Sequence, residues 1–155
     1  MLSKQASHAL KALLLLAAEP QLWRSTHQLA NAQALPESML EQLLLRLRRG
    51  GLLVARRGRT GGYRLALPPR QISLAAVLAA LGEAEARSAA SAWVNVVPPG
   101  RLSDASAADQ VTLALARRLE RARLKALEAL SLEDLLFDLR SAEACRDEQG
   151  GLLLG

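Results

Sequence analysis

The chain has 155 residues, half of them hydrophobic, with 35 Leu and 29 Ala but only 3% aromatic residues. Leu and Ala are strong helix formers, whereas strands favour β-branched and aromatic side chains. The composition therefore argues against an all-β fold and predicts a mainly helical protein, one domain with or without a helical extension. The single cysteine, Cys145, excludes a disulfide framework within one chain.

The net charge of +5 is unevenly distributed along the chain. Residues 1–70 carry 11 Lys and Arg against three acidic residues, whereas residues 71–155 carry nine against 12. Eight arginines and no acidic residue lie between Gln42 and Leu81. A basic half of this kind implies a polyanionic partner, either nucleic acid or an anionic membrane. Because no stretch approaches the about 20 apolar residues that span a bilayer, and no secretion signal is recognisable, we expect a cytoplasmic protein without a membrane partner.

The first fifty residues show three helical patterns separated by turns. Residues 3–19 place apolar side chains at three- and four-residue spacings. Ser25 or Thr26 suits the N-cap of a short second helix that ends near residue 34. A third pattern begins after Leu35-Pro36 and stops at Gly50-Gly51. Three helices in this order, with a short turn before the third, predict a helix-turn-helix.

A hairpin is expected directly after the third helix. Residues 52–55 and 63–67 are short apolar-bearing runs, and the glycine-rich, basic segment 56–62 lies between them. Pro68-Pro69 ends the second run. Because an isolated hairpin is marginal in water, it must pack on the helices. Helices followed by a basic hairpin predict a winged helix-turn-helix DNA-binding domain over residues 1–82.

The remaining chain reads as a helical extension. A fourth helix is expected over residues 73–81, followed by an irregular segment at 83–105 that could bind an effector or take the place of a metal cluster. The longest helix is expected from 106 to 129 and the last from 131, so that residues 106–140 form dimerisation helices and 141–155 a flexible tail. The expected dimer seam consists of Val111, Leu115, Leu119, Ala122 and Ala126.

The third helix and the hairpin carry the functional signal. The N-terminal residues of a recognition helix meet base edges in the major groove, and Gln can pair with adenine while Glu can accept from cytosine. Arginines later in the helix suit phosphates, and arginines at the hairpin tip suit a narrow minor groove. For Glu41 and Gln42 the alternative is the solvated face of an amphipathic helix. The candidate DNA-binding residues are Thr26, Ser38, Glu41, Gln42, Arg46, Arg48, Arg49, Arg56, Arg57, Arg59 and Tyr63.

These residues resemble a known family, the Rrf-two (Rrf2) family of winged-helix transcription factors, which includes the iron–sulfur cluster regulator and the nitrite-sensitive repressor. The resemblance rests on Leu40-Glu41-Gln42-Leu43, Leu47-Arg48-Arg49-Gly50-Gly51-Leu52, Arg57-Gly58, Gly61-Gly62-Tyr63-Arg64-Leu65-Ala66 and Ile72-Ser73-Leu74. It implies a homodimer joined through the long helix and bound to double-stranded DNA at an inverted-repeat operator. It also implies that Ser38, Glu41 and Gln42 face bases and that Arg57 enters the minor groove.

The sequence departs from the family pattern at two places. Many members hold an iron–sulfur cluster on three cysteines before the dimer helix, but residues 83–109 contain no Cys and no His. Since clusters are held by several thiolates, we expect no cluster, metal or other cofactor, and Cys145 is either an incidental thiol or a redox or intersubunit contact. Gln5-Ala6-Ser7-His8 replaces the family's Lys-Gly-Arg-Tyr, which removes two cations that face the DNA backbone. Trp93 lies where the cluster would be and either lines an effector pocket or plugs the core.

The sequence therefore predicts a homodimeric, sequence-specific transcriptional regulator without a cluster, a repressor rather than an activator. No nucleophile–His–acid set, carboxylate pair or phosphate-binding glycine loop is recognisable, so we expect no enzymatic activity. One alternative is a winged-helix adaptor that binds a partner protein through residues 83–109 instead of, or in addition to, DNA. Another is a cluster sensor with ligands other than cysteine.

Overall fold

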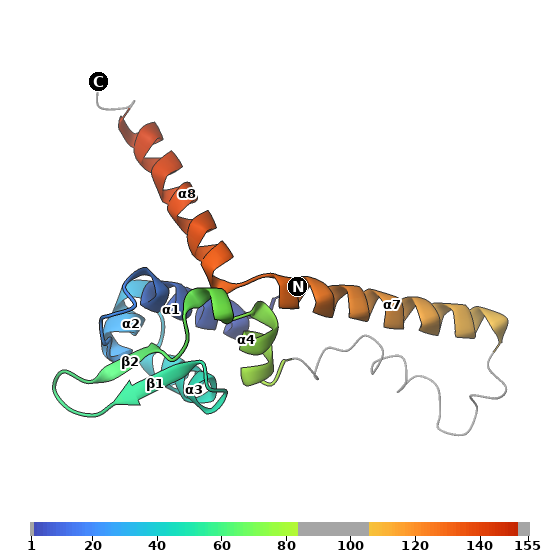
Figure 1. Cartoon of the computed structure of the whole chain (residues 1–155), viewed down its shortest axis with the longest axis horizontal. Coiled ribbons are helices and arrows are strands. Elements are labelled where there is room, and N and C mark those ends of the chain that lie inside the picture. The colour runs from blue at the N-terminus through green and yellow to red at the C-terminus, as the bar shows by residue number, and fades with distance from the viewer. Residues whose placement is uncertain (1, 84–105, 152–155) are drawn as a thin grey trace.

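The computed structural model describes residues 2–83 and 106–151. Figure 1 shows a small helical domain that carries a two-stranded hairpin on one side. Two long helices project from this domain. The mainly helical winged-helix fold predicted from the sequence is confirmed. Within the described ranges, no helix is both long and apolar enough to cross a bilayer.

The first three helices are α1 (Lys4–Ala18), α2 (Thr26–Gln33) and α3 (Glu37–Arg49). Ser25 caps α2 through a capping box, in which its hydroxyl accepts from the Gln28 amide and the Gln28 side chain accepts from the Ser25 amide. The turn between α2 and α3 depends on Ala34, whose left-handed φ of 50° reverses the chain. This arrangement is the helix-turn-helix that the sequence predicted.

The hairpin consists of β1 (Leu53–Arg56) and β2 (Gly62–Leu65) in antiparallel register. Leu53 lies opposite Leu65, and both are buried against the helices, as the marginal stability of a free hairpin requires. The second strand ends at Leu65, earlier than the expected residue 67, because the chain then turns toward the two prolines. It continues into a short 3₁₀ helix, η1 (Pro69–Gln71).

The core is built almost entirely from Leu and Ala. Among the described residues, no buried residue is polar or charged. The side chains of α3 that face inward, Leu40, Leu43, Leu44 and Leu47, are at most 2% exposed. They recur at spacings of three and four, so they occupy one side of the helix. The opposite side of α3 is therefore left to solvent.

One junction connects the long helices to this domain. After η1, helix α4 (Leu74–Ala80) packs on α7 (Ala107–Ala129), and α8 (Leu132–Gly151) follows α7 directly. The Leu74 amide donates to the Leu130 carbonyl at 2.9 Å, and the Leu132 amide donates to the Ile72 carbonyl at 2.8 Å. Leu132 itself is fully buried. The end of α7 and the start of α8 are thus fastened to the segment that leads into α4.

The structure differs from the sequence-based boundaries in the C-terminal part. Helix α8 continues to Gly151, whereas a flexible tail was expected from residue 141. Residues 141–149 contain neither Gly nor Pro, so nothing local ends the helix near residue 140. The expected irregular segment 83–105, which includes Trp93, lies outside the described residues apart from Glu83.

The burial of Leu132 at this junction leads to a prediction about the stability of the protein. Replacing Leu132 by Ala removes a fully buried side chain and leaves a cavity, so we expect unfolding free energy to fall by about 2–5 kcal/mol. Urea denaturation of both proteins measures the loss. Leu22→Ala serves as the control, because Leu22 is 50% exposed and its truncation should change stability by about 0.5 kcal/mol or less. Equal effects of the two substitutions would show that α8 is not docked on the domain.

Candidate nucleic-acid interface

Helix α3 presents one exposed face to solvent. Ser38, Glu41 and Gln42 are all exposed, on the side opposite the four buried leucines. Leu45 and Arg49 continue the same stripe at helical spacing, and Leu45 is 37% exposed. Leu45 is not among the residues predicted from the sequence, although its spacing from Glu41 and Gln42 marks it as a member of this face. An exposed leucine among polar groups can contact the methyl group of thymine.

The arginines of α3 have different surroundings. Arg46 lies at one edge of the exposed face, where its Nη1 donates to the Gln5 side chain at 3.3 Å and to the Leu81 carbonyl at 3.5 Å. Arg48 and Arg49 are exposed and have no charged partner in the part of the chain that the structure describes. Arg46 therefore connects α3 with α1 and α4, whereas the other two are available to an external anion.

A polar chain links α2 to the start of α3. Asn31 Nδ2 lies 3.0 Å from His27 Nε2, and His27 Nδ1 lies 3.1 Å from a Glu37 carboxylate oxygen. The imidazole thus bridges the Asn31 amide and the Glu37 carboxylate through its two ring nitrogens. Thr26, a candidate DNA-binding residue, is half-buried in the first turn of α2, next to His27. These contacts tie the first turn of α2 to the first residue of α3.

The tip of the hairpin projects two arginines. Residues 57–61 join the strands, and the Gly61 amide closes the turn by donating to the Gly58 carbonyl at 3.0 Å. Arg57 and Arg59 are fully on the surface and make no ion pair or hydrogen bond within the described ranges. A glycine-rich loop with two unpaired guanidinium groups has the shape and charge that a narrow minor groove accepts.

The tip end of the hairpin is held by an isolated β-bridge between Arg24 and Tyr63. The Arg24 amide donates to the Tyr63 carbonyl at 3.1 Å, and the Tyr63 amide donates to the Arg24 carbonyl at 2.8 Å. Gly62 makes this approach possible, because a Cβ there would lie 2.4 Å from the Arg24 carbonyl oxygen. The Tyr63 ring packs against the core. Tyr63 therefore supports the hairpin, unlike the exposed candidates around it.

Trp23 contacts two arginines of the hairpin. The guanidinium carbon of Arg56 lies 4.6 Å from the ring centroid, and that of Arg64 lies 4.7 Å from it. Arg56 Nη2 also donates to the Thr60 carbonyl at 2.6 Å. Arg56 was predicted as a DNA contact, but Trp23 and Arg64 were not, because no local pattern indicates a contact between residues more than thirty positions apart.

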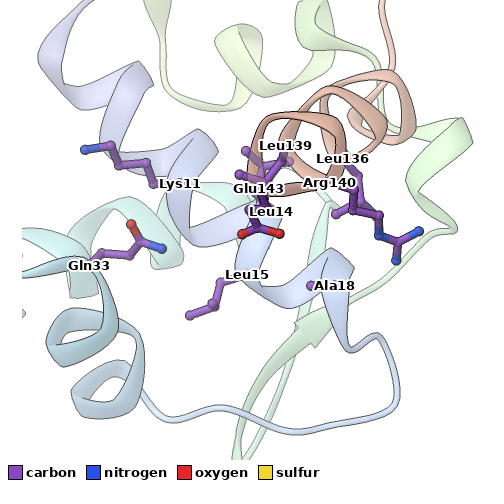
Figure 2. A pocket seen from close by; sticks show the side chains of 9 residues that line it. All are labelled: Lys11, Leu14, Leu15, Ala18, Gln33, Leu136, Leu139, Arg140 and Glu143. Atoms are coloured by element: carbon purple, nitrogen blue, oxygen red, sulfur yellow. The ribbon is translucent and has the colours of Figure 1, made fainter. Parts of the chain in front are cut away.

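A groove between α1 and α8 is a second feature of the surface (Figure 2). It has a volume of about 430 Å³, in the range of small-molecule sites. Apolar side chains of both helices form most of its lining, and Lys11, Arg140 and Glu143 lie along it. None of its lining residues belongs to α3 or to the hairpin. The groove is therefore separate from the DNA-facing candidates.

The expected dimer seam is exposed along α7. Val111, Leu115 and Leu119 are 68%, 54% and 60% exposed, and Ala122 and Ala126 are exposed as well. A different side of α7 packs on the domain, since Ala116 is buried and Leu127 is packed against the core. Large exposed apolar patches mark interaction sites. Helix α7 thus has two apolar sides, of which one has no partner within the described chain.

Comparisons with known proteins identify this architecture. A family model described as Rrf2, an iron-dependent transcriptional regulator, matches residues 2–138. A protein of Synechocystis sp. named as an HTH-type transcriptional regulator is 38% identical over 148 residues, which is 95% of each chain. The solved structure of T. potens IscR has a TM-score of 0.70 at 26% identity and covers 92% of this chain and 90% of that one. CymR, the global cysteine regulator of B. subtilis, has a TM-score of 0.67 at 28% identity, with coverages of 88% and 95%.

The donor atoms of this chain do not fit a cysteine-ligated iron–sulfur cluster. Its one cysteine, Cys145, is exposed on α8, and residues 83–109 contain no Cys and no His. In the described ranges, no three residues of the His, Cys, Asp and Glu types lie together in a way that would hold a metal ion. Because such clusters need several thiolates, a single chain cannot supply the usual ligand set.

The close approach of the Arg24 backbone to Gly62 leads to a prediction about the hairpin. Gly62→Ala should break the Arg24–Tyr63 pairing, because φ is +140° and the new Cβ would collide with backbone atoms. Gly58→Ala is the matched control, because its φ of +112° is also strained, by about 1–3 kcal/mol, but its Cβ meets nothing within 4 Å. Hydrogen exchange at the Tyr63 amide should accelerate strongly in Gly62→Ala only. Equal protection in both variants would refute the pairing.

Proposed function

This chain belongs to the Rrf2 family of DNA-binding transcriptional regulators, and we propose that it is a homodimeric repressor that binds an inverted-repeat operator without an iron–sulfur cluster. Its relatives are transcriptional regulators, not enzymes. The observation that supports the proposal is that α3 exposes Ser38, Glu41 and Gln42, while α3 and the hairpin tip expose arginines that have no ion pair among the described residues. A dimer bound over a promoter would exclude polymerase from it.

Base reading is assigned to the first turns of α3. Ser38, Glu41 and Gln42 are free to contact base edges in the major groove, and Leu45 adds an apolar contact. An acidic residue on a basic surface repels phosphate, so Glu41 serves selectivity better than affinity. Arg48, Arg49, Arg57 and Arg59 supply charge for the DNA backbone and the minor groove. Arg46 contributes less, because it is hydrogen-bonded within the protein.

Dimerisation is assigned to the exposed seam of α7. The seam is apolar over four turns, while charged residues such as Arg117 lie on the other side of the helix. Two copies related by a twofold axis would bury the same residues on both helices. A twofold dimer of winged helices reads two half-sites related by the same symmetry, which is why the operator should be an inverted repeat.

The proposal makes a prediction about recognition. Selection from random DNA should recover an inverted repeat with the wild type. Glu41→Ala should flatten the preference at one base pair of each half-site, by about 1–3 kcal/mol. Arg57→Ala should weaken binding to all sequences alike and lower the slope of log K against log salt by about 1.

The outcomes separate the proposal from its rival. No enriched motif at moderate salt, together with one partner protein recovered in equimolar amount, would replace the regulator by an adaptor that binds protein. A wild-type preference that survives Glu41→Ala unchanged would remove Glu41 from base recognition.

A second prediction concerns the dimer. Leu115→Glu would place an unpaired carboxylate in the exposed seam that the proposed dimer buries, so we expect dimerisation to weaken by about a hundredfold or more. Sedimentation equilibrium measures the dissociation constant, and operator affinity should fall with it. Arg117→Glu is the control, because it makes a larger charge change on the opposite side of the same helix. A dimer that tolerates Leu115→Glu but not Arg117→Glu would place the interface elsewhere.

A further inference from the structure

The outer face of the hairpin concentrates positive charge around one aromatic ring. Arg56 lies opposite Gly62, and Arg64 lies opposite Val54. In a strand successive side chains alternate between faces, so both arginines lie on the face away from the buried Leu53 and Leu65. They are neighbours on a diagonal of a two-stranded sheet, where like charges destabilise the pairing.

Trp23 is positioned to offset this repulsion. Arg24 is fixed to Tyr63 by two backbone hydrogen bonds, which form an antiparallel bridge at the edge of the hairpin. Trp23, the preceding residue, therefore projects to the same outer face as the two arginines. Both guanidinium groups lie within 4.7 Å of its ring centroid, a distance at which the negative face of an indole attracts cations.

The ring holds the arginines without neutralising them. Neither Arg56 nor Arg64 forms an ion pair with an acidic residue among the described residues. A carboxylate in this place would cancel the charge that attracts DNA. A guanidinium over an aromatic ring keeps its full charge, and its N–H groups point outward in the guanidinium plane. Arg56 uses one of these groups to bond the Thr60 carbonyl, which also ties it to the hairpin tip.

We propose that Trp23 is the positioning residue of the wing, holding Arg56 and Arg64 as oriented donors for two DNA phosphates and fixing the tip that carries Arg57 and Arg59. The inference rests on the proposed DNA-binding function and adds a residue that the recognition-helix argument does not involve. Ordering two flexible arginines before binding lowers the entropy lost when phosphates arrive.

The test compares Trp23→Leu with Trp23→Phe. Trp23→Leu keeps apolar bulk but removes the aromatic face, so operator affinity should fall by about tenfold, with a salt slope smaller by about two phosphates. Trp23→Phe should recover most of both. Leu22 precedes Trp23 and its side chain is exposed, so Leu22→Ala should bind the operator as the wild type does. Fluorescence anisotropy with labelled operator, at a temperature where thermal melts show every variant folded, measures affinity and slope.

A mutant cycle shows whether Trp23 acts through the arginines. Arg56→Ala with Arg64→Ala should lower affinity about as much as Trp23→Leu, and adding Trp23→Leu to that pair should produce little further loss. In a Trp93→Phe background, Trp23 is the one indole of the chain. Its emission should shift when operator binds and should also shift in the two arginine variants.

Each outcome bears on the proposal. Wild-type affinity and slope in Trp23→Leu, or tighter binding because the arginines are released, would overturn it while leaving the regulator intact. A lower melting temperature with unchanged affinity would show a purely structural role and would also overturn it. If the wild type itself binds no duplex, both the proposed function and this inference fail.

Discussion

The burial of one side of α3 is the constraint on which the surface of this protein depends. Its four inward leucines are held in a core that, within the described residues, contains no polar or charged side chain. A helix fixed on one side must present the other, so the orientation of Ser38, Glu41 and Gln42 follows from packing on the opposite side. A rotation of α3 that brought a buried leucine to the surface would turn these three side chains toward the core.

The same constraint explains the distribution of charge. A core of Leu and Ala cannot accept an unpaired guanidinium, because removing such a charge from water is strongly unfavourable. The eight arginines between Gln42 and Leu81 must therefore lie on the surface of α3, the hairpin and the turn that follows. With no acidic residue in that segment, repulsion between them is relieved by carbonyl groups and by the ring of Trp23.

The sequence predicts the elements well because their signals are local. Ser25 caps α2, the leucine spacing defines α3, and Gly50-Gly51 ends it. The parts that were missed depend on contacts between distant segments. Neither the stacking of Arg64 on Trp23 nor the inward position of Tyr63 can be read from neighbouring residues. The length of α8 was missed for a different reason, since a polar sequence without Gly or Pro is compatible with either helix or tail.

The geometry of the α7 junction determines how a dimer would present its two recognition helices. Helix α7 ends at a carbonyl that accepts from the first residue of α4, and α4 in turn lies against the end of α3, where a Cβ on Gly50 would be 2.5 Å from the Ala80 side chain. No flexible segment separates the proposed dimer seam from α3 along this path. The half-site spacing would therefore be set by short backbone contacts.

The groove between α1 and α8 borders the same junction from the other side, since Leu136 is both part of its lining and buried in the core. A molecule bound in the groove would therefore contact Leu136, one of the side chains that hold α8 against the DNA-binding domain.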